Sequence, residues 1–157
     1  DFKIYTPEFM KRIKELTESG SSVILSGAYV GTDLLPAGDS TALKFASSVL
    51  HFKPRTGHAV KNGKVYATDY VKPLFDIGLS FNTGYSEKIY SVEAPDAIEP
   101  EGKGAICAFR YSENNTSGGI IYKGNYKTVI LGFPIETINR EPERNLLMKQ
   151  IINFFEK

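Results

Sequence analysis

Two short apolar runs near opposite ends of the chain constrain the fold more than any other feature. They are Val23-Ile24-Leu25 and Thr128-Val129-Ile130-Leu131. Both runs are continuous rather than alternating, which is typical of strands covered on both faces in a parallel sheet. We therefore expect a layered α/β structure whose parallel core contains residues 22–26 and 127–132.

Helical patterns flank both runs. Thr6-Pro7 is typical of an N-cap and first helical position, and the spacing that follows predicts a helix over residues 6–19. A second helix is expected over 40–50, after an interruption at 36–38. A third is expected over 142–156, where two overlapping apolar rows form a face wide enough to lie on a sheet.

The middle of the chain, residues 51–133, has short strand patterns separated by turn residues. Asn62-Gly63 predicts a two-residue hairpin. Residues 105–133 predict an antiparallel β-meander of three strands, joined by a polar loop and a tight Gly124-Asn125 turn. We therefore expect an antiparallel addition to the α/β core.

Length and charge restrict the functional classes. A chain of 157 residues fits a single domain over 1–157, and 19 basic against 18 acidic residues give a net charge of +1. The charges are scattered, which does not favour nucleic acid as a partner. No apolar run approaches the roughly 20 residues that span a bilayer, so membrane insertion is not expected. The sequence leaves the oligomeric state open.

The stretch that follows the first apolar run is the first candidate site. Gly27 and Gly31 precede Thr32-Asp33, at a strand-to-helix turn of the kind that holds nucleophiles and phosphates. All four residues are ligand-binding candidates. We favour a structural interpretation, in which the glycines let the backbone turn and Thr32 and Asp33 cap a helix. A phosphate cradle needs more glycines and a Lys-Ser/Thr pair.

The order of a helix, ESGSSVILSG, a turn, a helix, and later TVILGFPIETI before a final helix resembles the class I glutamine amidotransferase-like superfamily, whose fold is flavodoxin-like. In that superfamily the buried strand ends in Gly-x-Cys-x-Gly. Tyr29 stands at the cysteine position here, and a one-residue shift of register would place Ser26 or Gly27 there instead. The resemblance implies a site without its nucleophile.

The second motif of that superfamily, Phe-His-Pro-Glu, supplies the base and its orienting carboxylate. Here Gly132-Phe133-Pro134-Ile135-Glu136 carries Phe133 in place of the histidine, and Glu136 remains after one inserted residue. Covalent catalysis needs a nucleophile beside an oriented base. The resemblance therefore implies a degenerate site at Ser26, Tyr29, Phe133 and Glu136. Glu136 would then be available to cap the following turn or to pair with a cation such as Arg110.

Four longer phrases, LSGAYVGTDL, YSVEAPDAIEP, FRYSENNTSGGIIYKGNYK and ILGFPIETI, are similar to secreted bacterial proteins labelled xanthan lyases. Those proteins join such a domain to a golvesin/xanthan-lyase-type carbohydrate-binding-like module. The resemblance implies a secreted or periplasmic location, with a signal sequence outside this chain, and polysaccharide or neighbouring protein modules as partners.

Because the chain opens almost directly on a helix, we expect an incomplete domain of a longer polypeptide.

A polar cluster at a strand end is the second candidate site. It consists of Arg110, Tyr111, Ser112, Asn114 and Asn115. Such an Arg and Asn set suits a uronate-type ligand, with the tyrosine as acid or base, and Arg110, Tyr111 and Asn114 are the ligand-binding candidates. The alternative is a solvated hairpin loop with Arg110 paired to a carboxylate.

Cys107 is expected to be an inert thiol on an apolar face. We expect neither a metal site nor a cofactor.

These features lead to competing hypotheses. The leading one is a catalytically silent amidotransferase-like interaction or scaffolding module of a secreted glycan-handling protein. The alternatives are a polysaccharide lyase that uses Arg110, Tyr111 and Asn114, or a serine-based hydrolase that uses Ser26.

Overall fold

The computed structural model describes residues 3–35 and 40–157. The helical elements are α1 (Pro7–Glu18), η1 (Thr32–Leu34), α2 (Ser40–Phe45), η2 (Ala46–Leu50), η3 (Ile135–Thr137) and α3 (Glu141–Glu156). The strands are β1 (Val23–Ser26), β2 (Phe52–Thr56), β3 (Lys64–Ala67), β4 (Gly78–Ser80), β5 (Ala97–Pro100), β6 (Ala105–Tyr111), β7 (Ser117–Lys123) and β8 (Lys127–Leu131). The expected interruption at 36–38 lies outside the described residues. None of the described helices has the length and apolar character needed to cross a membrane.

The strands form a curled mixed sheet in the order β1-β8-β7-β6-β3-β4, and β2 pairs with β5 in a second, two-stranded sheet. β1 runs parallel to β8, with Val23 opposite Thr128 and Leu25 opposite Ile130. The expected parallel core is therefore confirmed, and the fold is α/β. In the described part of the chain the other strand pairs are antiparallel.

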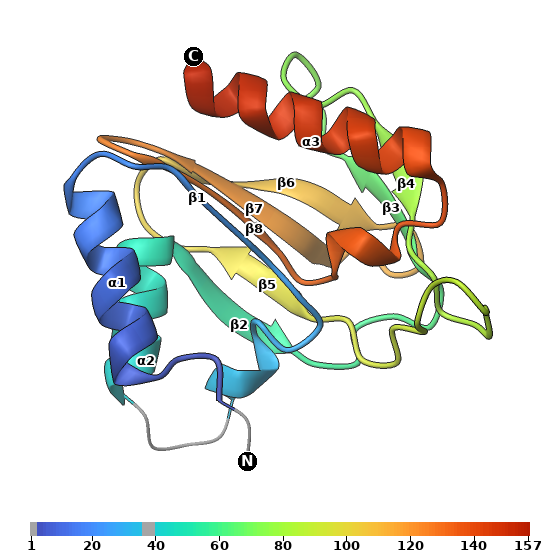
Figure 1. Ribbon diagram of the computed structural model, residues 1–157, viewed down its shortest axis with the longest axis horizontal. Coiled ribbons are helices and arrows are strands. Elements are labelled where there is room, and N and C mark those ends of the chain that lie inside the picture. Colours follow the sequence, from blue (N-terminus) through green and yellow to red (C-terminus); the bar gives the residue numbers. More distant parts are fainter. Residues whose placement is uncertain (1–2, 36–39) are drawn as a thin grey trace.

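Both faces of the β1–β8 region are covered, which explains its continuous apolar sequence (Figure 1). Val129 and Leu131 belong to the core cluster that contains α3, whereas Ile130 belongs to the cluster that contains α1, α2 and β2. Alternate residues of a strand point to opposite faces, so both faces need residues that can be buried. The polar Thr128 is buried because its hydroxyl donates to the Leu50 carbonyl at 3.1 Å.

The terminal helices follow the sequence prediction closely. α1 begins after Thr6, whose hydroxyl accepts a hydrogen bond from the Phe9 amide at 3.2 Å, as expected of an N-cap. α3 buries Leu147, Ile151 and Phe154 against the sheet. The predicted helix over 40–50 is present, but its second half, η2, is a π-helical turn.

The predicted meander is confirmed, but the predicted hairpin at Asn62-Gly63 is wrong. β6, β7 and β8 pair in sequence order. In contrast, β2 pairs with β5, and β3 pairs with β4 and β6, so Asn62-Gly63 joins no paired strands. A Cβ at Gly63 would lie 2.1 Å from the Phe81 carbonyl oxygen. Close approach of two backbone segments, rather than turn geometry, therefore requires this glycine.

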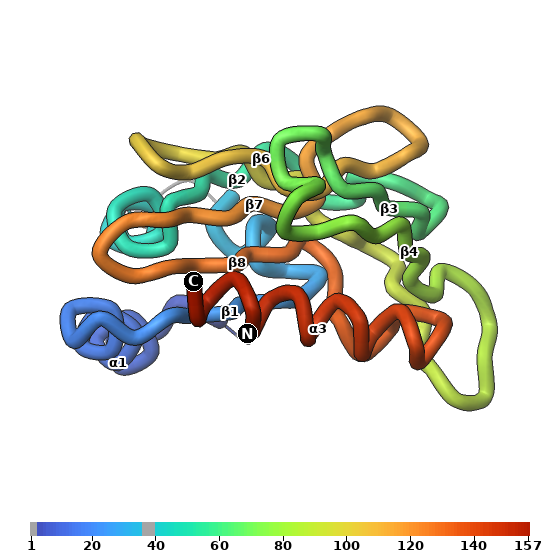
Figure 2. Tube along the Cα trace, turned by 90° about the horizontal axis from the view of Figure 1, so that it is seen from above, coloured from blue at the N-terminus to red at the C-terminus, as the bar shows by residue number. Residues whose placement is uncertain are grey.

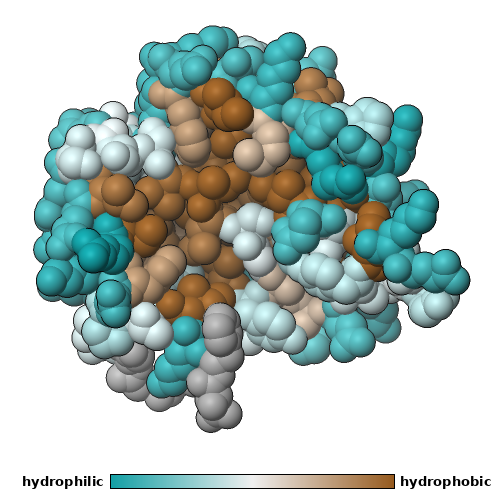
Figure 3. All heavy atoms as spheres, viewed as in Figure 1, coloured by the Kyte–Doolittle hydropathy of each residue, from teal (hydrophilic) through white to brown (hydrophobic). Residues whose placement is uncertain are grey.

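β1 is an edge strand of the six-stranded sheet. Seen from above, it lies between α1 and α3 (Figure 2). Apolar residues gather in the middle of the face drawn in Figure 3, over the region of β1 between these two helices. Among the partly buried apolar residues there, Ile13 and Leu25 pack against one core cluster and Ile24 and Met148 against the other.

Candidate functional site

The carboxyl ends of β1 and β8 meet in a crevice, as a parallel pair requires. The Ser26 hydroxyl donates a hydrogen bond to the Phe133 carbonyl at 3.0 Å and accepts one from the Ile135 amide at 2.9 Å. The segments 26–31 and 133–136 therefore approach each other, as the sequence predicted. A shallow pocket beside them is lined in part by Ser26 and Glu136.

The side chains at the resembled catalytic positions do not form a reactive set. Phe133 is fully buried and stacks on Phe81, with ring centroids 5.1 Å apart. Tyr29 is 58% exposed. Glu136 accepts a hydrogen bond from Tyr90 at 2.9 Å rather than pairing with Arg110. Burial, followed by this carboxylate, raises the pKa of Tyr90 to about 12.

Asp96 is the central polar residue of this region, and the sequence analysis missed it. Its carboxylate is fully buried and accepts hydrogen bonds from the Gly31 amide at 2.6 Å, the Thr32 amide at 3.0 Å and the Thr32 hydroxyl at 2.5 Å. Consecutive amides at such a turn form an anion-binding concavity. The turn therefore does hold an anion, and that anion is a side chain of the protein itself.

The surroundings of Asp96 are tightly packed. Burial raises the pKa of its carboxyl group, although the hydrogen bonds from Thr32 and Gly31 oppose that shift. Its amide donates to the Gly132 carbonyl at 2.7 Å, and its carbonyl accepts from the Tyr111 hydroxyl at 2.7 Å. Only the pattern of a lone aspartate between apolar residues in APDAI signalled a buried carboxylate.

The candidate turn residues have roles that differ from those expected. Gly31 has a φ of −93°, and Gly27 is not among the described glycines with positive φ. Gly31 is instead closely packed, since a Cβ there would lie 3.1 Å from an Ile98 side-chain methyl, which would have to shift by a few tenths of an ångström. Thr32 donates to Asp96, and the Asp33 carboxylate accepts from the Ile4 amide at 2.8 Å, so neither side chain caps a helix.

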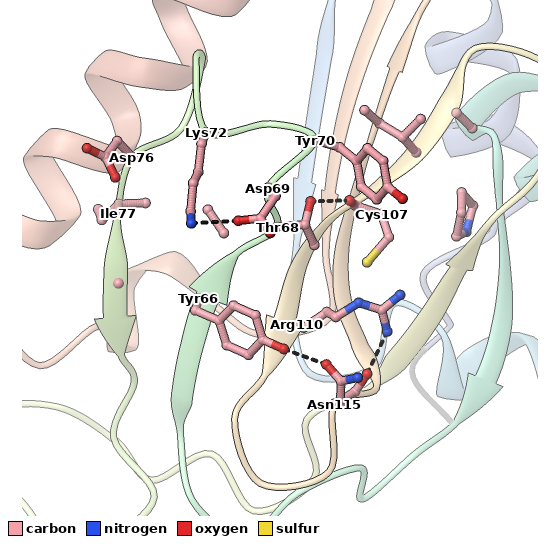
Figure 4. A pocket seen from close by; sticks show the side chains of 15 residues that line it. Tyr66, Thr68, Asp69, Tyr70, Lys72, Asp76, Ile77, Cys107, Arg110 and Asn115 are labelled. Carbon is pink, nitrogen blue, oxygen red and sulfur yellow. Dashed lines mark hydrogen bonds and ion pairs between the residues drawn. The ribbon is translucent and has the colours of Figure 1, made fainter.

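A second and larger cavity, of about 950 Å³, lies over β3, β4 and β6 (Figure 4). Tyr66 and Arg110 face each other across β3 and β6. Arg110 Nη1 donates to the Asn115 carbonyl at 2.6 Å, and the Tyr66 hydroxyl donates to the Asn115 side chain. Tyr70, 85% exposed, also lines this cavity.

The predicted Arg110, Tyr111 and Asn114 set is divided by the fold. Tyr111 is fully buried, and burial raises the pKa of its phenol, so this residue is unavailable to a ligand beside Arg110. Asn114 donates to the Ala59 carbonyl at 2.7 Å and accepts from the Thr116 amide at 3.0 Å, so its side chain holds its loop against the segment at Ala59. The expected carboxylate partner of Arg110 is also wrong, since among the described residues no acidic side chain lies within 4.0 Å of it.

Cys107 lines the cavity rather than the core, which corrects the predicted apolar environment. The β6–β7 register shifts between Cys107 and Phe109, where Ala108 is the additional residue. This bulge buries both Ala108 and Phe109 and leaves Cys107 half-buried on the cavity side. Burial still raises the pKa of the thiol, and the Ser117 side chain and then the nearby Arg110 charge lower it by smaller amounts.

His51 lies apart from both sites, whereas His58 lies close to Asp96, and its charge lowers the pKa of the Asp96 carboxyl. His51 stacks on Tyr122, with ring centroids 3.5 Å apart, and its Nε2 lies 3.0 Å from the Tyr126 hydroxyl oxygen. His58 has a φ of +48°. Within residues 3–35 and 40–157, no three His, Cys, Asp or Glu side chains are grouped so that they would hold a metal ion.

No protein-family model matches the chain, and comparison with curated protein sequences finds no significant match. The resemblance to the amidotransferase-like superfamily thus stays a prediction. The function has to be inferred from the geometry of the two sites.

Proposed function

We propose that this chain is a catalytically silent, amidotransferase-like interaction module of a secreted or periplasmic protein that handles glycans. One observation supports the silent character most directly. The Ser26 hydroxyl both donates to and accepts from main-chain groups at 2.9–3.0 Å, and the position of the resembled base is the buried Phe133. A nucleophile needs a base that can take its proton.

Asp96 adds a second reason. Acyl-transfer chemistry stabilises a developing oxyanion with backbone amides. Here the amides of Gly31 and Thr32 already bind the Asp96 carboxylate, at 2.6 and 3.0 Å. A substrate oxyanion at these amides would have to displace a buried side chain, which favours a structural role for the turn.

We also propose that β1 and β8 belong to a flavodoxin-like sheet that continues through a strand from a neighbouring segment or module of the polypeptide. Because the Gly27 amide donates to the Leu131 carbonyl on the β8 side, the alternate amides of Ile24 and Ser26 point to the outer edge. The apolar surface around β1 supports such an addition (Figure 3).

The silent character is tested by incubating the protein with glutamine, a nitrophenyl ester and polygalacturonate. We expect no turnover above background, and the same result for Ser26→Ala, Tyr29→Ala and Glu136→Ala. Ser47→Ala is the matched control, because the exposed Ser47 hydroxyl donates only to its own helix, at the Lys44 carbonyl. Ester or glutamine hydrolysis that Ser26→Ala abolishes and Ser47→Ala retains would establish the hydrolase alternative instead.

The strand addition has its own measurement. In the longer polypeptide the Ile24 amide should exchange with solvent more slowly than in this chain alone, whereas the Leu25 amide, which faces β8, should change little. Equal exchange of Ile24 in both forms would contradict the addition at β1.

A further inference from the structure

The cavity over β3, β4 and β6 contains a cation that is fixed in place but has no countercharge. Arg110 is held by one 2.6 Å hydrogen bond, from Nη1 to the Asn115 carbonyl. Of the ion pairs between described side chains, none involves Arg110. The cross-strand pairing with Tyr66 and the preceding bulge direct the guanidinium into the cavity, between Asn115 and Cys107 (Figure 4).

This arrangement suits a planar anion. A guanidinium presents five donors in a fixed fork, and within residues 3–35 and 40–157 only one nitrogen of Arg110 has a protein acceptor. Asn115 adds a side-chain amide beside it, oriented by the hydrogen bond from the Tyr66 hydroxyl. A carboxylate at this position would receive parallel hydrogen bonds from Arg110.

The remaining lining groups suit a hydroxylated ring. Tyr70 and Tyr66 are 85% and 39% exposed, and their rings provide flat apolar surfaces against which a sugar can pack. Asp69 and Asp76 line the side of the cavity near Lys72, and Asp69 pairs with Lys72 at 2.6 Å. Carboxylates accept hydrogen bonds from sugar hydroxyls, which a polyphosphate does not have.

We infer that this cavity binds a carboxylate-bearing oligosaccharide, with the uronate group on Arg110 and a sugar ring against Tyr70. The cavity volume of about 950 Å³ is within the usual range for ligand sites and accommodates several sugar units. The inference rests on one part of the proposed function, its catalytically silent character, because the oligosaccharide is bound and released without being cleaved.

Titration calorimetry tests the inference with three probes: tetragalacturonate, the neutral maltotetraose and tripolyphosphate. We expect tetragalacturonate to bind at least about tenfold more tightly than either of the others, because only it offers both a carboxylate and a sugar ring. Equal affinity for the neutral probe, or preference for tripolyphosphate, would overturn the assignment.

Variants locate the site. Arg110→Gln should weaken tetragalacturonate binding about tenfold or more, and Tyr70→Ala should weaken it several-fold. Tyr70 is so exposed that its replacement cannot unfold the protein, which keeps the test valid if Arg110→Gln is unstable. Arg12→Gln on α1, whose side chain is 72% exposed and pairs with Glu15, is the matched control and should bind normally.

The outcomes separate the inference from the proposed function. Unchanged binding by both Arg110→Gln and Tyr70→Ala, or no binding by the native protein, would overturn the cavity assignment and leave the silent crevice intact. Binding followed by release of an unsaturated product would retain the cavity assignment and overturn the proposed function.

Discussion

The two candidate sites lie on the same sheet but differ in how their polar groups are used. In the crevice, Ser26 and Asp96 make all their described hydrogen bonds to neighbouring backbone and side-chain groups, and Asp96 is fully buried. In the cavity over β3 and β6, Arg110 has one protein acceptor, and the Tyr70 ring is mostly in solvent.

The comparison shows that residues at positions resembling a catalytic site need not be the residues whose polar groups are free to bind a ligand. A buried polar group must be satisfied by the protein, because an unpaired donor or acceptor there is costly. These hydrogen bonds fix the structure, and Ser26 and Asp96 would have to give them up to bind a ligand. The cavity, which is open to water, retains donors and a charge that a ligand can use.

The largest expected effect is on the crevice side, at Gly132. A Cβ there would lie 2.1 Å from the Asp96 carbonyl oxygen, and both groups belong to backbone that cannot move aside. Gly132→Ala should lower the free energy of unfolding by about 3–5 kcal/mol, measured by denaturant titration. Gly84→Ala, where no atom lies within 4 Å, should change it by less than about 0.5 kcal/mol. Similar values for both would contradict the close packing of the crevice.

Asp96 should give the next largest effect. Asp96→Ala leaves two amides and the Thr32 hydroxyl without their acceptor and should cost about 3 kcal/mol. Asp96→Asn keeps an acceptor and removes a charge whose burial raises the carboxyl pKa, so it should cost less. Thermal unfolding measures both, with the exposed Asp69→Ala as the control. Equal losses at positions 96 and 69 would remove the distinction between the two sites.

On the cavity side, the reactivity of Cys107 tests whether its thiol lies in the same environment as Arg110. Because burial raises the pKa of its thiol, iodoacetamide should label the native protein at least about tenfold more slowly than the unfolded chain at neutral pH. Arg110→Gln should slow labelling further, because the Arg110 charge lowers that pKa. Rapid native labelling that Arg110→Gln leaves unchanged would show that the two side chains do not share an environment.

The smallest effect concerns His51, which lies outside both sites. Burial lowers its pKa below 6.5, so the folded state binds fewer protons than the unfolded state. The stability that His51 contributes is therefore fully present above pH 6.5. It is lost as the pH falls through the lower pKa that His51 has in the folded state. Asparagine tolerates the left-handed φ of 62° at this position. His51→Asn should therefore make the free energy of unfolding depend less on pH. An unchanged pH dependence of unfolding in His51→Asn would contradict this assignment.

The sequence by itself determined the parallel β1–β8 pair, the terminal helices and the meander. Each of these depends on a local pattern: continuous apolar residues, a Thr-Pro helix start, or turn residues between apolar runs. It also predicted that residues 26–31 and 133–136 meet, because the ends of parallel strands share one edge of a sheet.

Only the tertiary structure decided which polar groups are available. Asp96 and Gly31 are 65 residues apart, and no local pattern connects the carboxylate to the amides that it binds. The bulge at Ala108 places Cys107 in the cavity on the side of Arg110, although simple alternation puts Cys107 and Phe109 on one face. Hydrogen-bond partners and strand register depend on long-range packing, which a one-dimensional pattern does not contain.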